Sequence, residues 1–545
     1  MLTLLAADGA EAADKIIPAS TELAIGLTIY LLAIFGLSIY ASRKVSNEED
    51  YVVAGRRLPL FLAWGTLLAT WFGAATILGA AEATRDGGIR DTLLDPWASG
   101  CALIIAGLFF AKPLWEMKLL TMGDFYGRVY GKRTETIASM ILVPGYFGWI
   151  GAQFIALAAI QTAYFPIEGL PEWGSIIFVA SLILIYTLVG GMWSVTLTDT
   201  LQLVVLLFGL LVLGEAVFST LGNGSIADGA NRLLNESDPD ALTLLPLAGL
   251  PAGLIWLGTL GSGFFGNVPG QDLMQRVFAS KDSKTAVWAC LLAGVAYLAF
   301  GMIPLAMGLA SKILVPEETD QKILTILASQ FLSPTMTAVF VVSLISIVVS
   351  TATSAVLAPA TILGHNLMLP LMGKTVNKLA LERFAVFLMV SGGVVLALSG
   401  EKILGLLELT LSTVFVALFV PLLMGLFGRP RGQLPAILAM IFGISLWLAR
   451  ELMEGLLLPM PEEFEDQFSF YADYVHAKHL TGSTVRDSFL YTFALFPSAI
   501  LGITASFIGY FVGQKLNADV PVNPRPQDMI PNATEGETVG ETAPA

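Results

Sequence analysis

The stretch VVSLISIVVSTATSAVLAPA at residues 341–360 carries the strongest signal for both fold and site. It is apolar enough to cross a bilayer, yet its serines recur at steps of three and four, which aligns their hydroxyls along one helix face. These serines are Ser343, Ser346, Ser350 and Ser354. Back-bonding to the carbonyl one turn earlier, or helix packing, is the favoured explanation for any single one of them. A stripe ending in Ser350-Thr351 without charge also suits a monovalent cation, so we predict a sodium site.

Composition indicates a polytopic membrane protein. Hydrophobic residues make up 55% of the chain and charged residues only 13%, and apolar runs of about twenty residues recur throughout. The first run, from residue 21, is too long for a signal-peptide core, so it is expected to be a retained helix. Cys101 and Cys290 fall inside apolar runs, which supports neither a disulfide framework nor a thiolate metal site. Without a phosphate loop or nucleophile elbow, we expect no enzyme, organic cofactor or nucleic-acid partner.

Hydropathy predicts an all-α protein with about thirteen transmembrane helices. The predicted spans are 21–42, 60–83, 92–114, 134–164, 175–190, 195–217, 250–277, 284–312, 334–363, 380–400, 403–424, 434–456 and 489–512.

Lysine and arginine in the loops predict the orientation. Basic residues gather after the first and third spans and recur on the same side later in the chain, whereas the opposite loops are acidic. Because cytoplasmic loops carry the excess of Lys and Arg, the N-terminus is expected outside and the C-terminus inside. The expected location is the plasma membrane, which is the inner membrane in a Gram-negative bacterium.

Two of the predicted spans look broken. Span 60–83 carries three glycines around Trp71-Phe72-Gly73, and span 250–277 contains GTLGSGFFGNVPGQ. Close helix packing is the alternative for either span alone. If the first helix is left out, however, the two are the first and sixth of ten consecutive spans. This placement predicts an inverted five-helix repeat with its site at the breaks.

The domain boundaries follow from that repeat. We expect an extracytoplasmic N-terminal segment 1–20, an additional helix 21–42, a first repeat 60–217, a second repeat 250–424, C-terminal helices 434–512 with an outer loop 457–488, and a disordered cytoplasmic tail 516–545.

Several motifs resemble those of the sodium/solute symporter family. They are AGRRLP (54–59), GGMWSVTLTDTLQ (190–202), QRV (275–277) and STATS (350–354). The sequence around them, including GLFFAKPL (107–114), is most similar to the high-affinity choline transporter branch. The resemblance covers roughly residues 20–430 and implies a leucine-transporter-type fold.

The resemblance also implies the ligands of a sodium ion. They are the hydroxyls of Ser350 and Thr351 together with the carbonyls of Ile347, Ala69 and Phe72. A second cation or coupling site in some members uses the acid of the TDxxQ motif, which is Asp199 here. The alternative for Asp199 is a helix-starting acid at the membrane boundary.

For the solute, the resemblance implies a cage of tryptophans around a trimethylammonium group. Trp71 and Trp149 match two positions of that cage, but the third is Gly270, with Gln271 beside it in the predicted pocket. Asp95, which the choline-transporter pattern lacks, would supply a counter-charge for an amine or would lie at the outer surface.

These features predict a sodium-coupled secondary active symporter that imports a small organic solute by alternating access. Choline or another amine or quaternary ammonium compound is the favoured solute; an amino acid, carboxylate or sugar is the alternative. A membrane sensor built on the same fold is an alternative of another class. The expected partners are the solute, sodium and the lipid bilayer, and the oligomeric state is left open.

Overall fold

The structure is a computed structural model of the 545-residue chain. It describes residues 21–46, 48–189, 192–245, 249–316, 322–372, 377–400, 402–457 and 496–524. Within these ranges the chain is helical and contains no strand beyond two isolated bridges. The predicted segment 1–20, nearly all of the outer loop 457–488 and the tail beyond residue 524 lie outside the described residues.

The first half of the chain contains the helices α1 Thr21–Ser42, α2 Glu48–Val53, α3 Leu60–Trp71, α4 Ala80–Gly87, α5 Ser99–Ile105, α6 Ala111–Glu116, α7 Met122–Tyr130, α8 Lys132–Gly145, α9 Phe147–Tyr164, α10 Glu172–Val189, α11 Met192–Leu221 and α12 Ile226–Glu236. The second half contains α13 Gly249–Gly266, α14 Gln271–Ala279, α15 Ser283–Leu314, α16 Ile323–Phe331, α17 Pro334–Ile362, α18 Leu369–Met372, α19 Lys378–Ala397, α20 Ile403–Val414, α21 Val420–Phe427, α22 Leu434–Leu457 and α25 Ser498–Leu516. Short 3-10 or π-helical segments connect some of them: η2 Ala54–Arg56, η3 Ala75–Gly79, η4 Ile89–Thr92, η5 Leu93–Ala98, η6 Ala106–Phe110, η7 Pro239–Leu242, η8 Leu363–Met368 and η9 Phe415–Phe419.

The predicted spans fall on these helices, but their number is not confirmed as thirteen. In the described part of the chain, 10 helices are long and apolar enough to cross a membrane, or 11 if a bent pair counts as one more span. The predicted span 175–190 corresponds to the shorter apolar helix α10, and span 250–277 is divided between α13 and α14. The all-helical membrane architecture is therefore confirmed, whereas a count made from hydropathy depends on how broken spans are treated.

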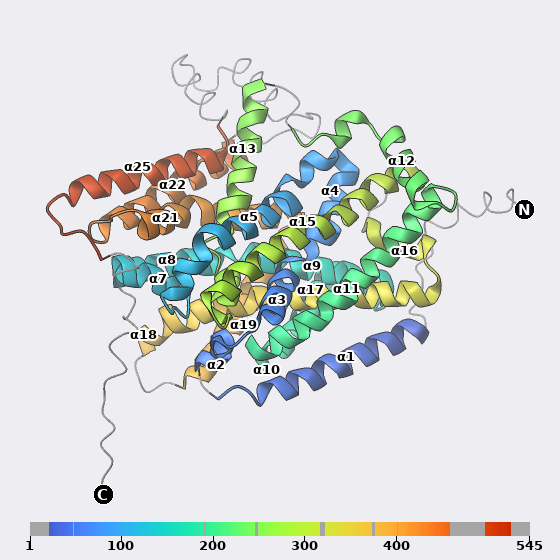
Figure 1. Ribbon diagram of the computed structural model, residues 1–545, viewed down its shortest axis with the longest axis horizontal. Coiled ribbons are helices and arrows are strands. Elements are labelled where there is room, and N and C mark those ends of the chain that lie inside the picture. The colour runs from blue at the N-terminus through green and yellow to red at the C-terminus, as the bar shows by residue number, and fades with distance from the viewer. Residues whose placement is uncertain are drawn as a thin grey trace, which may run out of the picture.

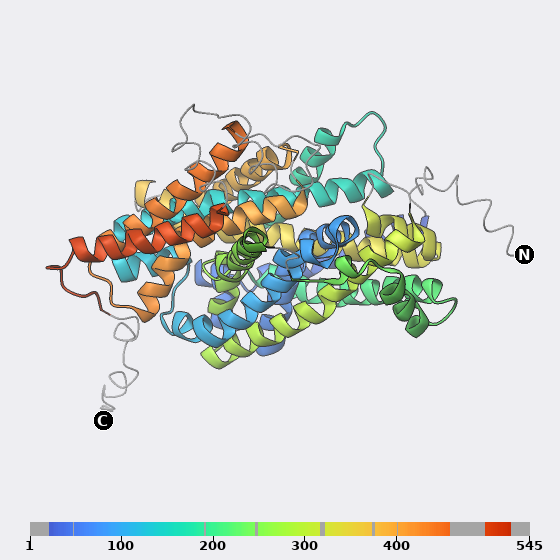
Figure 2. The same ribbon diagram turned by 90° about the horizontal axis from the view of Figure 1, so that it is seen from above.

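Both predicted breaks are present. Leu60–Trp71 and Ala75–Gly87 together form one apolar segment that bends by 56°. The backbone leaves helical geometry at Phe72, where ψ is 65°. The second break separates α13, which ends at Gly266, from α14, which begins at Gln271. In Figure 1, α13 stands nearly upright, and in Figure 2 it is seen end-on. Unwound backbone at membrane depth is tolerated where it is buried or lines a cavity.

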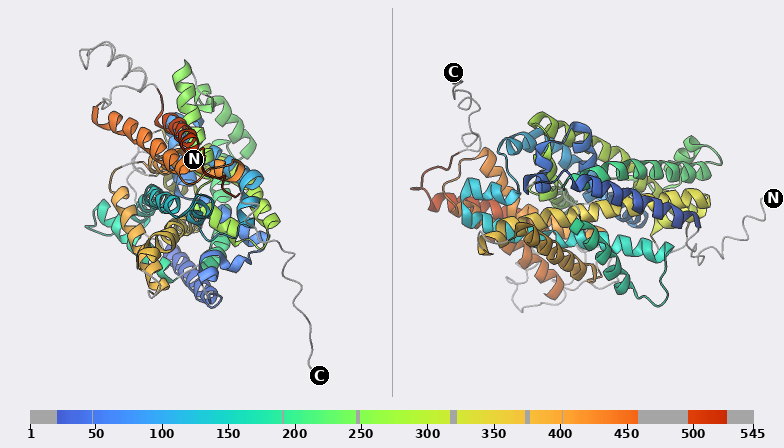
Figure 3. Two further views of the ribbon diagram at one scale, coloured as in Figure 1. Left: turned by 90° about the vertical axis from the view of Figure 1, so that its left-hand side faces the viewer. Right: turned by 90° about the horizontal axis from the view of Figure 1, so that it is seen from below.

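Helix α17, which carries the serine stripe, lies in the interior of the bundle. It packs against α1, α3, α9, α11 and α19. In the most apolar part of Pro334–Met372, 83% of the residues are buried, compared with 22% in that of Thr21–Ala41. Helix α1 accordingly lies along one edge of the bundle in Figure 1. The left panel of Figure 3 looks along the long axis of the molecule and shows the helices packed side by side.

The start of the C-terminal tail does not match the predicted disorder. Residues 517–524 fold back against the loop before α22. The Arg431 guanidinium donates to the Ala518 carbonyl at 2.6 Å, and the Asn523 amide donates to the carbonyls of Val129 at 2.9 Å and Gly432 at 3.0 Å. The prediction was wrong for this stretch because polar side chains that look solvated in the sequence satisfy exposed backbone groups of neighbouring loops.

Candidate functional site

The first break brings a free carbonyl of α3 to the hydroxyls of α17. The Gly73 amide donates to the Trp71 carbonyl at 2.8 Å, so it does not make the helical bond to Ala69, four residues earlier. The Ala69 carbonyl instead accepts from the Thr351 hydroxyl at 3.2 Å. A Cβ on Gly73 would lie 2.7 Å from the Thr351 hydroxyl oxygen, so this close approach requires glycine.

The second predicted hydroxyl, Ser350, contacts the predicted coupling acid. Ser350 and Thr66 both donate hydrogen bonds to the Asp199 carboxylate, with Thr66 at 2.6 Å. Asp199 is 1% exposed and lies two turns inside α11, which begins at Met192. This position does not suit a helix-starting acid at the membrane boundary. The other two members of the predicted sodium set, Phe72 and Ile347, are fully buried.

Two other serines of the stripe, Ser343 and Ser354, make different kinds of contact. Ser343 bonds back to the Phe340 carbonyl within α17 at 2.7 Å, as serines in membrane helices often do. Ser354 instead accepts from the buried Arg276 guanidinium of α14 at 2.6 Å and lies 3.4 Å from the Thr70 hydroxyl of α3. The C-terminal half of the stripe therefore connects both broken helices through polar contacts.

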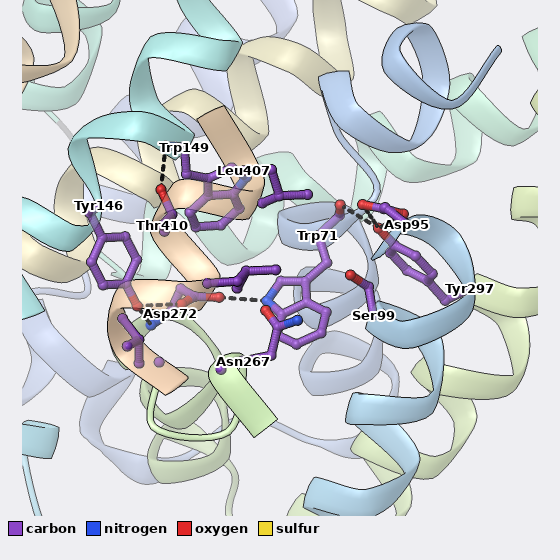
Figure 4. A pocket seen from close by; sticks show the side chains of 14 residues that line it. Trp71, Asp95, Ser99, Tyr146, Trp149, Asn267, Asp272, Tyr297, Leu407 and Thr410 are labelled. Atoms are coloured by element: carbon purple, nitrogen blue, oxygen red, sulfur yellow. Dashed lines mark hydrogen bonds between the residues drawn. The ribbon is translucent and has the colours of Figure 1, made fainter. Parts of the chain in front are cut away.

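A pocket lies next to this polar region, between the two breaks (Figure 4). Its lining includes Trp71, Trp149, Asp95 and Gly270, so four of the five residues predicted for the solute come together. Gln271 is not among the lining residues. Its side-chain oxygen accepts from the Met122 amide at 2.7 Å, and its nitrogen points to the Leu120 carbonyl at 3.4 Å.

Asp95 is a buried acid of the pocket and not a surface residue. It is 3% exposed, and its carboxylate accepts from the Tyr297 hydroxyl at 2.9 Å. The Thr76 hydroxyl lies 3.3 Å from the same carboxylate. Both neighbours are neutral, and no basic side chain of the described residues forms an ion pair with Asp95. The expectation that it lies at the outer surface is therefore not supported.

A second acid of the pocket, Asp272, was not predicted from the sequence. It lies in the first turn of α14 and accepts from the Trp71 indole and from the Tyr146 hydroxyl, each at 2.5 Å (Figure 4). These bonds fix the Trp71 ring at the edge of the pocket. A signal was present, since Asp272 and Arg276 are charges inside a predicted membrane span, and such charges mark functional sites by default.

Five further polar residues of the lining could not be identified as pocket residues from the sequence. Tyr146, Tyr297, Asn267, Ser99 and Thr410 come from five different segments of the chain. Tyrosine, serine and threonine are common in membrane helices, and only the folded arrangement shows that these five face one cavity.

Several curated relatives of the chain are named high-affinity choline transporters, and others are named for pantothenate and glucose. It is 26% identical over 419 residues to high-affinity choline transporter 1 of Drosophila melanogaster, covering 73% of this chain and 66% of that protein. It is 27% identical to the Caenorhabditis elegans protein of the same name, covering 82% and 80%. For the Homo sapiens protein the identity is 27%, with coverage of 77% and 75%.

Solved structures support the fold. A Na⁺-coupled sialic acid symporter in a substrate-bound, outward-open state superposes with a TM-score of 0.71 at 14% identity, covering 93% of this chain and 99% of that one. A nucleobase-cation-symport-1 family transporter gives a TM-score of 0.52 at 16% identity, covering 87% and 97%. These likenesses confirm the expected transporter fold. Residues 51–443, more than half of the chain, match the sodium:solute symporter family, and the chain therefore belongs to that family.

Proposed function

We propose that this sodium-coupled symporter imports a small organic cation, choline or another amine or quaternary ammonium compound, by alternating exposure of one central site. The observation that carries the proposal is Asp95, a buried carboxylate in the pocket that has only neutral partners. A buried charge needs a compensating charge. Trp71 and Trp149 line the same cavity and offer indole faces to a cation. The relatives named for choline transport agree with a cationic solute.

In this proposal one sodium ion binds where the first break meets α17. The hydroxyls of Ser350 and Thr351 and the carbonyls of Ala69, Phe72 and Ile347 provide neutral oxygens, which suit a hard monovalent cation. The contact between Thr351 and Ala69 supports the set, because it shows that α3 and α17 approach closely enough to share an ion.

Coupling between ion and solute would run through the first broken helix. Trp71 lines the pocket, and Phe72, the next residue, contributes to the proposed ion site. Sodium binding would hold α3 against α17 and thereby stabilise the backbone that carries Trp71, so the solute would bind more tightly when the ion is present. The positive-inside pattern favours a plasma-membrane protein with its N-terminus outside. The inward sodium gradient across that membrane would drive the solute inward.

The direct test is uptake by proteoliposomes that contain the full chain. We expect saturable accumulation of an organic cation that requires an inward sodium gradient and stops when potassium replaces sodium. Transport that does not saturate, or that is unchanged without the sodium gradient, would contradict a symporter.

A substitution series at Trp71 tests the role of its ring. Trp71→Phe keeps an aromatic face and should weaken solute binding modestly, whereas Trp71→Leu should weaken it by about tenfold or more, because a desolvated cation–π contact is worth about 2 kcal/mol. Binding is measured by thermal shift or calorimetry in sodium. Trp288→Leu is the matched control, since that ring is 49% exposed on α15. Equal binding of a charged solute and its neutral isostere to the parent would refute the cation–π account.

Asp199→Asn tests the coupling role. This change removes the charge but nearly keeps the shape, so we expect solute binding to persist while sodium-driven accumulation falls several-fold. The measurement is the ratio of sodium to solute taken up by proteoliposomes. Normal uptake with an unchanged ratio would assign Asp199 to a purely structural role, as an acceptor for Ser350 and Thr66.

A further inference from the structure

The hydroxyl hydrogens around the pocket are already directed at the protein itself. Ser99 donates to the Leu94 carbonyl at 3.2 Å, and Thr410 donates to the Leu406 carbonyl at 3.1 Å. Tyr146 donates to Asp272 at 2.5 Å. A hydroxyl has one hydrogen but two acceptor lone pairs, of which the Trp149 amide uses one on Thr410 and the Asp272 amide one on Tyr146, so each of these groups can offer the solute an acceptor but no hydrogen.

The lining has four side-chain N–H hydrogens, on Trp71, Trp149 and Asn267. Two of them are bonded to the protein itself and two are not. The Trp71 indole donates to Asp272, and one amide hydrogen of Asn267 points to the Gly263 carbonyl at 2.7 Å. The second Asn267 amide hydrogen and the Trp149 indole hydrogen are left for a solute. Side-chain donors are therefore scarce in this pocket.

Among the lining side chains, the Asp95 carboxylate has the most lone-pair sites that lack a hydrogen-bond donor. An ionised carboxylate has about four lone-pair sites. Its neighbours Tyr297 and Thr76 carry one hydrogen each, and their oxygens lie 2.5 Å apart, so one of the two hydrogens lies in the contact between them. The pair has one hydrogen left, for which the Trp71 carbonyl also competes at 3.0 Å from the Tyr297 hydroxyl. Asp95 therefore accepts at most one hydrogen bond from this pair.

The geometry points to a solute whose charged group carries N–H bonds, that is, a protonated primary, secondary or tertiary amine, in preference to a quaternary ammonium ion. This inference rests on the proposed function and narrows its solute class. An ammonium group supplies both the positive charge and the donors that the buried carboxylate lacks. A quaternary nitrogen supplies only the charge, and its methyl groups would separate that charge from the Asp95 oxygens.

The second broken helix supports the same choice. Position 270, which the resemblance assigns to the third wall of the cage, is glycine, and a Cβ there would meet the Asp272 carboxylate at 2.9 Å and the Tyr146 hydroxyl at 3.3 Å. The pocket thus has carboxylates on two sides of Trp71 and lacks one aromatic wall (Figure 4). The two remaining donors, from Trp149 and Asn267, suit an acceptor such as a hydroxyl elsewhere on the solute.

The test compares matched pairs of cations that differ only in N-methylation. Ethanolamine and choline form one pair, with the mono- and dimethyl forms between them, and methylammonium and tetramethylammonium form another. Binding to the full-length protein is measured in sodium by calorimetry or thermal shift. We expect the N–H member to bind about tenfold or more tightly, with the largest single step at the loss of the last N–H.

Variants at two acids show whether Asp95 is responsible. Asp95→Asn should bring the affinities within a pair close together, because it removes the charge that the N–H group meets. Asp91→Asn makes the same change four residues earlier, at an exposed position, and should leave the preference intact. Tighter binding of the quaternary member in the parent, or an unchanged preference in Asp95→Asn, overturns the inference but leaves an organic-cation symporter standing. A parent that binds none of these cations but binds a neutral or anionic solute overturns the proposed function and the inference together.

Discussion

Replacing both Ser350 and Thr351 by alanine is expected to abolish sodium-driven uptake while leaving the protein folded. The two hydroxyls occupy the point where α17 meets the first break, and one of them contacts the Ala69 carbonyl that the break frees. Removing two of the proposed oxygen ligands should raise the sodium concentration for half-maximal binding by about tenfold or more. The measurements are uptake in proteoliposomes and sodium-dependent thermal shift.

A matched double variant in the same helix separates ion binding from general damage. Ser343 and Thr353 are buried hydroxyls that bond back to carbonyls within α17, at 2.7 Å to Phe340 and at 2.8 Å to Ser350. Ser343→Ala with Thr353→Ala makes the same chemical change and should leave the sodium dependence unchanged. An unaltered sodium dependence in the Ser350 and Thr351 variant would remove the proposed ion site.

The fold was predictable because its decisive features are periodic or compositional. Apolar runs of membrane length locate the helices, and glycine and proline density locates the breaks in two equivalent spans. Hydropathy does not show whether a predicted span is one continuous helix. Span 250–277 was expected to be broken, and the structure places the break at Asn267 to Gly270, between the separate helices α13 and α14. The folded start of the tail was missed because its contacts are single polar bonds to distant loops.

The site was predictable only in part, because the sequence does not show which helix faces meet. The serine stripe was visible, yet its members behave differently: Ser343 bonds within its own helix and Ser350 bonds to Asp199 on α11. Asp272 faces the pocket, whereas the adjacent Gln271 points to the connection before α7. Neighbours in a helix point about 100° apart, so a motif match alone does not assign both to one cavity.

Arg276 is expected to be indispensable for stability, because it is the positive charge placed among buried acids. It is 1% exposed and interacts electrostatically with Asp199 and Asp272. Its guanidinium donates to the Ser354 hydroxyl at 2.6 Å and to the Asp272 carbonyl at 3.1 Å. Arg276→Gln should destabilise the protein by about 3–5 kcal/mol, since it leaves carboxylates buried without a compensating charge. The measurement is the melting temperature of the purified protein without sodium or solute.

A double variant shows whether the loss is one of charge balance. Adding Asp272→Asn to Arg276→Gln removes one of the uncompensated charges but also an acceptor of Trp71 or Tyr146, so the double variant should lose less stability than the two single variants lose in sum. Arg232→Gln is the control, because Arg232 pairs with Glu236 on the exposed surface of α12 and contributes little. If the losses of the two single variants simply add, Arg276 acts through its hydrogen bonds to Ser354 and the α14 backbone, and the electrostatic account fails.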